Sequence, residues 1–173
     1  MAPIFLIGYM GSGKTTFGRR IAQAIGRPFI DLDQLIEAQE GATVSQIFAD
    51  KGETAFREME RDYLRKASQN TDAVIATGGG APCFFDNMEF MNTKGLTVFF
   101  DLSPEELLKN LRNAYTERPL LKGKTEEELL KFIVEMLEKR KSFYNQAKLK
   151  VNPAREPIEM IVSYILININ ALR

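Results

Sequence analysis

The stretch GYMGSGKTTFGRR, residues 8–20, contains two glycines separated by four residues and followed directly by Lys14 and Thr15. This is the pattern of a P-loop, in which backbone N–H groups and the positive end of the next helix attract a phosphate. The glycines let the backbone approach the anion without a Cβ in the way. Lys14 can reach the β and γ phosphates of a nucleotide, and the Thr15 hydroxyl can bind Mg2+. The stretch therefore predicts a nucleotide phosphate site.

The sequence on either side of this loop has the pattern that a P-loop requires. Residues 3–7, PIFLI, form an apolar run typical of a buried parallel strand, and residues 16–25 carry apolar side chains at helical spacing. Strand and helix patterns alternate along the rest of the chain, which predicts an α/β fold with a five-stranded parallel sheet flanked by helices. The further strands are expected at 29–33, 73–77, 96–100 and 149–151, and the further helices at 34–40, 44–69, 104–112, 126–146 and 156–168.

Composition restricts the classes of function. With 45% hydrophobic residues and 23 basic against 23 acidic residues, residues 1–173 are expected to form one soluble domain with no nucleic-acid or membrane partner. The sequence has no histidine and a single cysteine, Cys83, which excludes His-dependent catalysis, His-ligated metals and an intramolecular disulfide. Any general base is therefore expected to be a carboxylate. No signal peptide and no apolar run of membrane-spanning length is visible, which predicts a cytoplasmic protein.

Carboxylates and glycines follow two of the predicted strands, at the edge of a parallel sheet where ligands bind. Asp31 and Asp33 are two residues apart at the end of a strand, so the strand period places both side chains on one face. One carboxylate could serve Mg2+ and the other could orient or deprotonate a hydroxyl, although Asp33 is also suited to cap the next helix. Residues 77–80, TGGG, end another strand and provide either a tight turn or a bare backbone surface for a substrate.

Three arginines are candidates for anion binding. Arg57 and Glu60 are three residues apart on one helix face, where the arginine is either a salt-bridge partner or a bidentate ligand for a carboxylate. Arg118 lies in a polar segment, residues 113–125, that is a candidate lid, from which a cation could close over a transferring phosphate. Arg140 lies near a basic helix end. Sequence spacing does not decide whether these side chains meet.

Taken together, these stretches resemble the shikimate kinase family in order and in spacing, over nearly the whole chain. The resemblance implies a single P-loop kinase domain, residues 1–173, with a mobile lid at about 113–125. It also implies the ATP-dependent phosphorylation of the 3-hydroxyl of shikimate, giving shikimate 3-phosphate and ADP, in aromatic amino acid biosynthesis. ATP is the implied co-substrate, Mg2+ the implied metal, and a monomer the implied state. The matching stretches are residues 8–15, 31–33, 56–60, 77–80, 118–121 and 140–144.

The resemblance implies a role for each matching residue. Lys14, Asp33 and Arg118 are the implied catalytic residues, with Asp33 as the candidate base, while Thr15 and Asp31 are implied at the metal. Glu60 is implied to hold Arg57 in place, and adenine to lie between Arg112 and the loop 152–155. The implied substrate contacts are Asp33, Arg57, Gly79, Gly80 and Arg140. The implied nucleotide contacts are Gly11, Ser12, Gly13, Lys14, Thr15, Thr16, Arg112, Arg118 and Arg155.

Three other interpretations stay open. A gluconate kinase shares the P-loop and the lid, but it has less need of two separated arginines beside a triple glycine. A nucleoside monophosphate kinase needs a second phosphate site and a more arginine-rich lid. A non-catalytic nucleotide-binding switch would leave Asp31 and Asp33 without a use, and the Asn-Lys-x-Asp guanine signature is absent. The apolar segment 81–85, APCFF, either shapes the substrate pocket or only covers the sheet.

Overall fold

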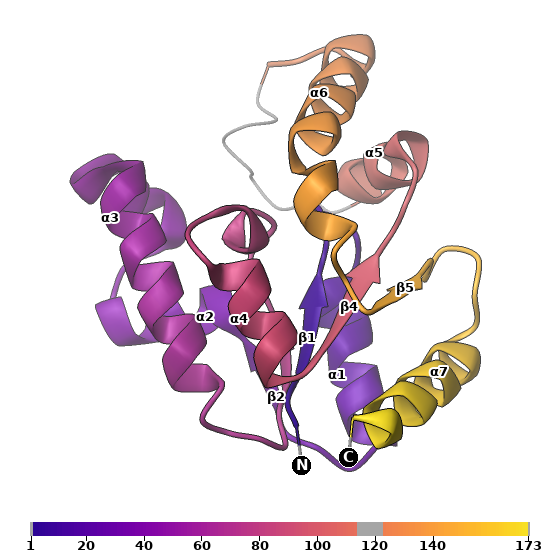
Figure 1. The fold of residues 1–173 in the computed structure, drawn as a ribbon. Helices are drawn as coiled ribbons and strands as arrows, with labels where there is room; N and C mark the ends of the chain where they lie inside the picture. Colours follow the sequence, from indigo (N-terminus) through magenta and orange to yellow (C-terminus); the bar gives the residue numbers. More distant parts are fainter. Residues whose placement is uncertain (1, 114–122, 173) are drawn as a thin grey trace.

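The computed structural model describes residues 2–113 and 123–172, which form a five-stranded parallel sheet with helices around it (Figure 1). The strand order is β2-β3-β1-β4-β5, and in the central strand Ile4 pairs with Val74 on one side and with Leu96 on the other. The predicted α/β fold with a parallel sheet is confirmed. The strands are β1 Ile4–Ile7, β2 Phe29–Asp31, β3 Val74–Ala76, β4 Leu96–Phe100 and β5 Leu149–Val151.

The helices differ from the predicted ones in two places. Helix α2 begins at Leu32, directly after β2, so Asp31 is its N-cap and Asp33 lies in its first turn. Helix α4 and the short 3-10 helix η1 are not indicated by the sequence, because α4 has no continuous apolar stripe. Capping boxes at Thr43 and Thr125 start α3 and α6. The elements are α1 Lys14–Ala24, α2 Leu32–Glu40, α3 Val44–Ala67, η1 Ala81–Cys83, α4 Asn87–Lys94, α5 Pro104–Asn113, α6 Glu126–Tyr144 and α7 Ile158–Ala171.

The central strand β1 is fully buried because helices cover both faces of the sheet. Ile4 and Leu6 belong to a core cluster that includes residues of α1 and α7, whereas Phe5 and Ile7 belong to a second cluster with residues of α3 and α4. This division follows from the strand period of two. Burying each of these side chains stabilises the fold by about 1.5–3 kcal/mol, and it anchors the strand from which the P-loop leaves.

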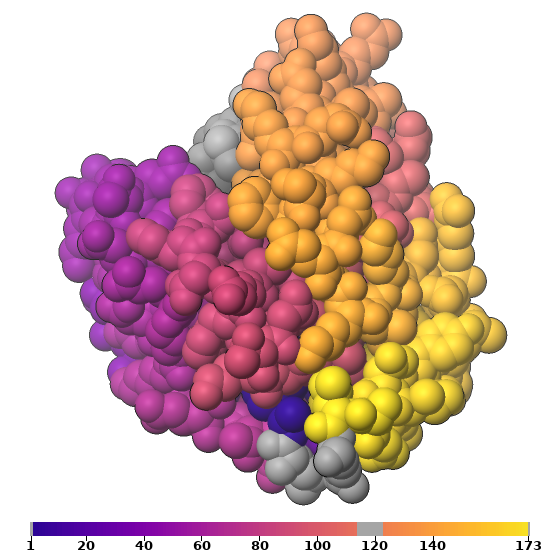
Figure 2. All heavy atoms as spheres, viewed as in Figure 1, coloured from indigo at the N-terminus to yellow at the C-terminus, as the bar shows by residue number. Residues whose placement is uncertain are grey.

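Helices α5 and α6 extend beyond the carboxyl ends of the strands, while both chain termini lie at the opposite end of the sheet (Figure 1). On the face shown in Figure 2, the surface of α6, in orange, adjoins that of η1 and α4, and α6 contacts η1. The carboxyl edge of the sheet is thus flanked by α2 and α3 on one side and by α5 and α6 on the other.

Part of the predicted lid cannot be placed against this framework. Of residues 113–125, residues 114–122 lie outside the described part of the chain, and Arg118 is among them. Within residues 2–113 and 123–172, no helix has both the length and the apolar character needed to cross a membrane.

Candidate active site

The P-loop joins β1 to α1, as the motif predicts. The N-cap of α1 is Gly13, whose φ of 91° is in the left-handed region that favours glycine, and no side chain caps the helix. The first N–H groups of α1 are thus available to an anion. The ammonium of Lys14 is buried and donates to the carbonyl oxygens of Gly8 at 2.7 Å and Tyr9 at 2.9 Å. The lysine is held over its own loop, where nucleotide phosphates would compete for its donors.

Thr15 and Asp31, the two expected metal ligands, are in direct contact. The Thr15 hydroxyl donates to Oδ2 of Asp31 at 2.6 Å, and Oδ1 of Asp31 accepts from the backbone N–H of Gln34 at 3.2 Å. The second bond is the N-cap of α2, so the capping role that the sequence offered to Asp33 belongs to Asp31 instead. The cap fixes the orientation of the carboxylate beside the P-loop threonine.

Asp33 reaches the site by a different route from the one predicted. The strand-period argument for Asp31 and Asp33 is wrong, because β2 ends at Asp31 and Asp33 belongs to α2. Both residues nevertheless line one cavity with Lys14. Burial raises the pKa of Asp33, the Asp31 carboxylate raises it further, and Lys14 opposes the shift. Asp33 is therefore a carboxylate of increased basicity beside the phosphate loop.

The three glycines after β3 each lie against a different predicted site residue. A methyl group at Gly78 would lie 2.7 Å from Oε1 of Glu60 and 3.0 Å from Oδ1 of Asp33. At Gly79 it would lie 3.3 Å from Nη1 of Arg140, and at Gly80 2.5 Å from Nη2 of Arg57. Because real Cβ atoms essentially never approach within 3.0 Å, Gly78 and Gly80 are needed for these close approaches. The glycine turn thus brings Asp33, Arg57 and Arg140 to one place.

Arg57 and Glu60 form a buried ion pair on α3, as their spacing predicts. Nη1 of Arg57 donates to Oε2 of Glu60 at 2.8 Å, and the Glu60 side chain is 1% exposed. Burial raises the pKa of Glu60 to about 7, although the neighbouring guanidinium lowers it. No described group hydrogen-bonds to the buried Nε of Arg57 or Oε1 of Glu60. Buried polar atoms without partners are costly and mark places where a ligand can supply the missing bond.

A cavity of about 420 Å3 lies beside the P-loop. Its wall includes the P-loop, the two aspartates and the start of the glycine turn. Two contacts that support it were not predicted: Nδ2 of Asn110 on α5 donates to the carbonyl oxygen of Gly11 at 2.8 Å, and the Tyr144 hydroxyl on α6 donates to that of Gly79 at 2.6 Å. The tyrosine four residues after Arg140 indicates only weakly that its hydroxyl contacts the glycine turn. Nothing in the sequence indicates that Asn110 contacts the P-loop.

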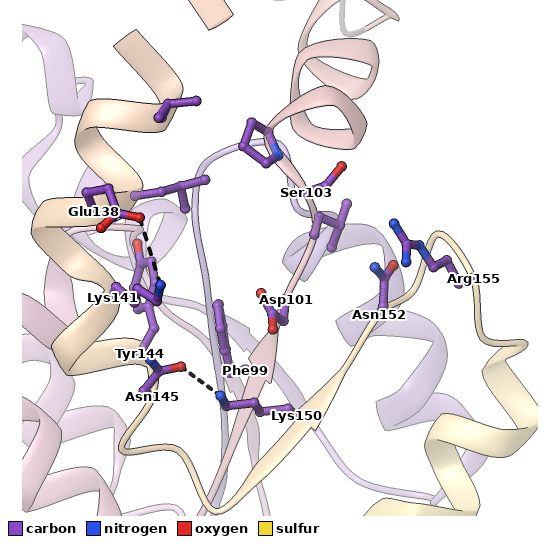
Figure 3. Close-up of a pocket in the computed structure, with 14 residues that line it drawn as sticks. Phe99, Asp101, Ser103, Glu138, Lys141, Tyr144, Asn145, Lys150, Asn152 and Arg155 are labelled. Carbon is purple, nitrogen blue, oxygen red and sulfur yellow. Dashed lines mark hydrogen bonds and ion pairs between the residues drawn. The ribbon is translucent and has the colours of Figure 1, made fainter. Parts of the chain in front are cut away.

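Arg112 and Arg155, the expected adenine contacts, are not brought together. Nη1 of Arg112 donates to Glu126 at 3.0 Å, whereas Nε of Arg155 donates to Glu106 at 2.7 Å, at the other end of α5. Arg155 lines a separate cavity of about 510 Å3 between α6, β4 and β5 (Figure 3). Among its charged side chains, Lys150 donates to Asn145 at 2.7 Å and Lys141 pairs with Glu138 at 3.9 Å.

The site combines a phosphate-binding loop with the residues expected to bind the substrate, so it has a donor part and an acceptor part. A loop for nucleotide phosphates opens into a cavity that Asp33 also lines, and the glycine turn at its edge lies against Arg57 and Arg140. Such a site can place the hydroxyl of a small acidic molecule in line with a terminal phosphate, which is what phosphoryl transfer to an alcohol requires. The chain is therefore an ATP-dependent P-loop kinase of the small-molecule class.

Comparisons with known proteins identify the family within this class. The shikimate kinase family model matches residues 10–170. A shikimate kinase of Bacteroides fragilis is 54% identical over 147 residues, which cover 85% of this chain and 82% of the relative. The crystal structure of the Bacteroides thetaiotaomicron shikimate kinase superposes with a TM-score of 0.92 at 46% identity, covering 98% of both chains. The solved structure of the Acinetobacter baumannii shikimate kinase in complex with shikimate gives a TM-score of 0.84 at 33% identity, covering 100% of this chain and 95% of that one. The chain belongs to the shikimate kinase family.

Proposed function

We propose that this chain is a shikimate kinase, which transfers the γ-phosphoryl group of ATP to the 3-hydroxyl of shikimate and releases shikimate 3-phosphate and ADP. The observation that carries the proposal is the meeting of Arg57, Arg140 and Asp33 at one glycine turn beside the P-loop cavity. Shikimate is a ring acid with neighbouring hydroxyls, so its recognition needs cations for the carboxylate and acceptors for the hydroxyls. The solved structure of the Acinetobacter relative in complex with shikimate supports this choice of acceptor.

In this mechanism Arg57 and Arg140 bind the substrate carboxylate, and Asp33 with the Gly79 and Gly80 backbone binds the ring hydroxyls. The 3-hydroxyl oxygen attacks the γ-phosphorus, the bond from that phosphorus to the β,γ-bridging oxygen breaks, and Asp33 accepts the hydroxyl proton. The raised pKa of Asp33, caused by its burial, makes the carboxylate a stronger base than an exposed one. Lys14 and the N–H groups of the P-loop stabilise the charge on the transferring group.

The donor set at the mouth of the P-loop fits Mg2+. The Thr15 hydroxyl and the Asp31 carboxylate are both hard oxygen donors, and they touch at 2.6 Å. We propose that Thr15 binds the ion directly and Asp31 through water; when bound, Mg2+ neutralises charge on the nucleotide phosphates. Among the described residues, no three His, Cys, Asp or Glu side chains gather into a metal-binding cluster.

The proposal also includes the parts of the site that lie apart or outside the described residues. Gly11, Ser12, Gly13 and Thr16 bind the nucleotide phosphates, and Arg118 closes over them with the lid. Arg112 and Arg155 bind the adenosine end after exchanging their acidic partners for the ligand. The protein acts as a monomer in the cytoplasm, which sedimentation of the pure protein and fractionation of its host cells test.

The deciding experiment measures ADP release in a coupled assay with Mg-ATP and four conditions: shikimate, gluconate, a nucleoside monophosphate and no acceptor. Turnover with shikimate alone is expected. Turnover with gluconate or the monophosphate instead would replace the proposal with the corresponding kinase. ATP binding without turnover on any acceptor would favour the nucleotide-binding switch.

The Asp33→Asn variant tests the assignment of the base. The asparagine keeps the size of the side chain but cannot accept the proton, so kcat is expected to fall by about 10²–10⁴-fold. ATP affinity, measured by calorimetry, is expected to stay within about twofold of the unmodified protein, since the P-loop is untouched. Unchanged turnover in Asp33→Asn would remove Asp33 from the mechanism while leaving the proposed substrate in place.

A further inference from the structure

The apolar segment after the glycine turn, residues 81–85, contacts Arg57. Its Phe84 ring centroid lies 4.2 Å from Cζ of Arg57, closer than those of Phe56 at 5.3 Å and Phe48 at 5.6 Å. Three aromatic rings thus surround the guanidinium that Gly80 also touches. A ring within about 6 Å of a guanidinium attracts it electrostatically, and the attraction grows when water is excluded. Of the three rings, Phe84 makes the closest contact.

A network of buried contacts holds the segment in this position. Asn87 at the start of α4 is fully buried, and its Nδ2 donates to the carbonyl oxygen of Ala81 at 2.9 Å. Its Oδ1 accepts from Nη1 of Arg65 on α3 at 2.9 Å, and Arg65 also pairs with Asp86. The backbone N–H of Asn87 donates to the carbonyl oxygen of Phe84 at 3.2 Å. The loop that carries Phe84 is therefore fastened at both ends and to α3.

The next residue shows that placing Phe84 has a conformational cost. Phe85 has a φ of 50°, and it is the single described residue other than glycine with positive φ. For a bulky side chain this conformation is an outlier, and such strain persists where the surrounding structure imposes it, often at ligand sites. Phe85 itself is 52% exposed, and Cζ of Arg61 lies 4.9 Å from its ring centroid. The turn thus directs one phenylalanine towards Arg57 and the other to the surface.

We propose that Phe84 is a positioning residue for the acidic substrate: with Phe48 and Phe56 it forms an aromatic cage that holds the Arg57 guanidinium in place for a carboxylate. The proposal rests on the proposed function, in which Arg57 binds the substrate carboxylate. Glu60 fixes Arg57 from one side through Nη1, and Phe84 restricts it from another. An arginine that is held in its binding geometry loses less conformational freedom when the anion arrives. Phe84 therefore acts on substrate affinity through Arg57.

The chain offers a matched pair of variants for the test. Phe84→Leu keeps an apolar side chain but removes the ring from Arg57, whereas Phe85→Leu removes the neighbouring ring from Arg61 only. Phe84→Leu is expected to raise KM for shikimate about tenfold, with KM for ATP and kcat each within about twofold of the unmodified protein. Phe85→Leu is expected to change none of the three constants. Phe84→Tyr retains the aromatic ring and is expected to have the same KM for shikimate as the unmodified protein.

The outcomes separate this inference from the proposed function. If the unmodified protein does not phosphorylate shikimate, the proposed function fails. If it does so and Phe84→Leu has an unchanged shikimate KM, or if Phe84→Leu and Phe85→Leu raise it equally, only the inference fails. A parallel rise in KM for ATP would likewise overturn it, since that is the result of general disorder. Circular dichroism checks folding, and if Phe84→Leu is unfolded the same comparison with Phe84→Met decides the question by the same criteria.

Discussion

Gly80→Ala is the sharpest test of how the arginine site is built. The backbone at Gly80 has φ −85° and ψ −20°, which alanine adopts without strain, so the whole effect of the substitution comes from its methyl group. That methyl would lie 2.5 Å from Nη2, 2.6 Å from Nη1 and 2.8 Å from Cζ of Arg57. The obstacle is the end of a long side chain, which can move, so the protein is expected to fold.

The distance that the Arg57 guanidinium must move determines how much activity Gly80→Ala loses. To restore an ordinary contact of 3.4 Å, the guanidinium must retreat by about 0.9 Å from the turn. Phe84 lies close to the same guanidinium, with its ring centroid 4.2 Å from Cζ. A displacement of about 1 Å at a binding group can cost about 10²-fold in rate, or about 2.7 kcal/mol of transition-state stabilisation. We therefore expect kcat/KM for shikimate to fall about a hundredfold in Gly80→Ala, with the KM for ATP unchanged, in the coupled ADP assay.

Gly41→Ala is the matched control. Gly41 ends α2 with a φ of 65°, and a methyl there would meet no atom within 4 Å. This variant is expected to lose about 1–2 kcal/mol of stability because alanine is strained in the left-handed region, but to keep its kinetic constants. If Gly80→Ala retains normal kcat/KM for shikimate, or loses activity only in proportion to a loss of folded protein, then Arg57 is not held against the turn as described.

Three further predictions concern other parts of the structure. Tyr144→Phe removes the hydroxyl that donates to the Gly79 carbonyl oxygen but keeps the ring against Phe99. Steady-state kinetics should show a KM for shikimate raised about threefold to tenfold and an unchanged KM for ATP, and equal changes in both KM values would contradict a local role of the hydroxyl. The pKa of Glu60 is raised by burial from 4.5 to about 7, so the free energy of unfolding should fall as pH rises through this window, because the folded state resists ionisation of Glu60. Urea titrations at several pH values should show a shallower decline for Glu60→Gln than for the unmodified protein, and identical slopes would refute the shift. Gly18→Ala places a methyl group 2.5 Å from the Phe29 ring, so urea unfolding should show a loss of about 1–3 kcal/mol of stability while the KM for shikimate stays constant. A more stable variant would show that α1 is packed less closely against β2 than described.

Much of the fold could be predicted because its signals are local. Residues 8–15 define a strand, a loop and a helix by their glycines and the apolar runs beside them, and each further strand is a short apolar run. The parallel sheet follows from the alternation of strands and helices. Helix α4 could not be predicted, because its apolar residues form no stripe, and residues 87–94 are helical through contacts with β4 and η1. Helix α2 starts earlier than its sequence suggests because Asp31, not Asp33, provides the cap.

The site divides in the same way between local pattern and long-range contact. The pair Arg57 with Glu60 joins residues whose types and spacing already indicated it, since helix periodicity brings residues three apart to one face. Thr15 and Asp31 come from different elements, and only the family resemblance implied that they share a site. The contacts of Gly80 with Arg57, Phe84 with Arg57, Asn110 with Gly11 and Tyr144 with Gly79 were beyond such reasoning. Sequence patterns describe which groups are available and on which face of an element they lie. Only the packing of the elements decides which of those faces meet, because the distances that matter here, such as the 2.5 Å between a methyl group at Gly80 and Nη2 of Arg57, depend on every side chain that separates one backbone from another.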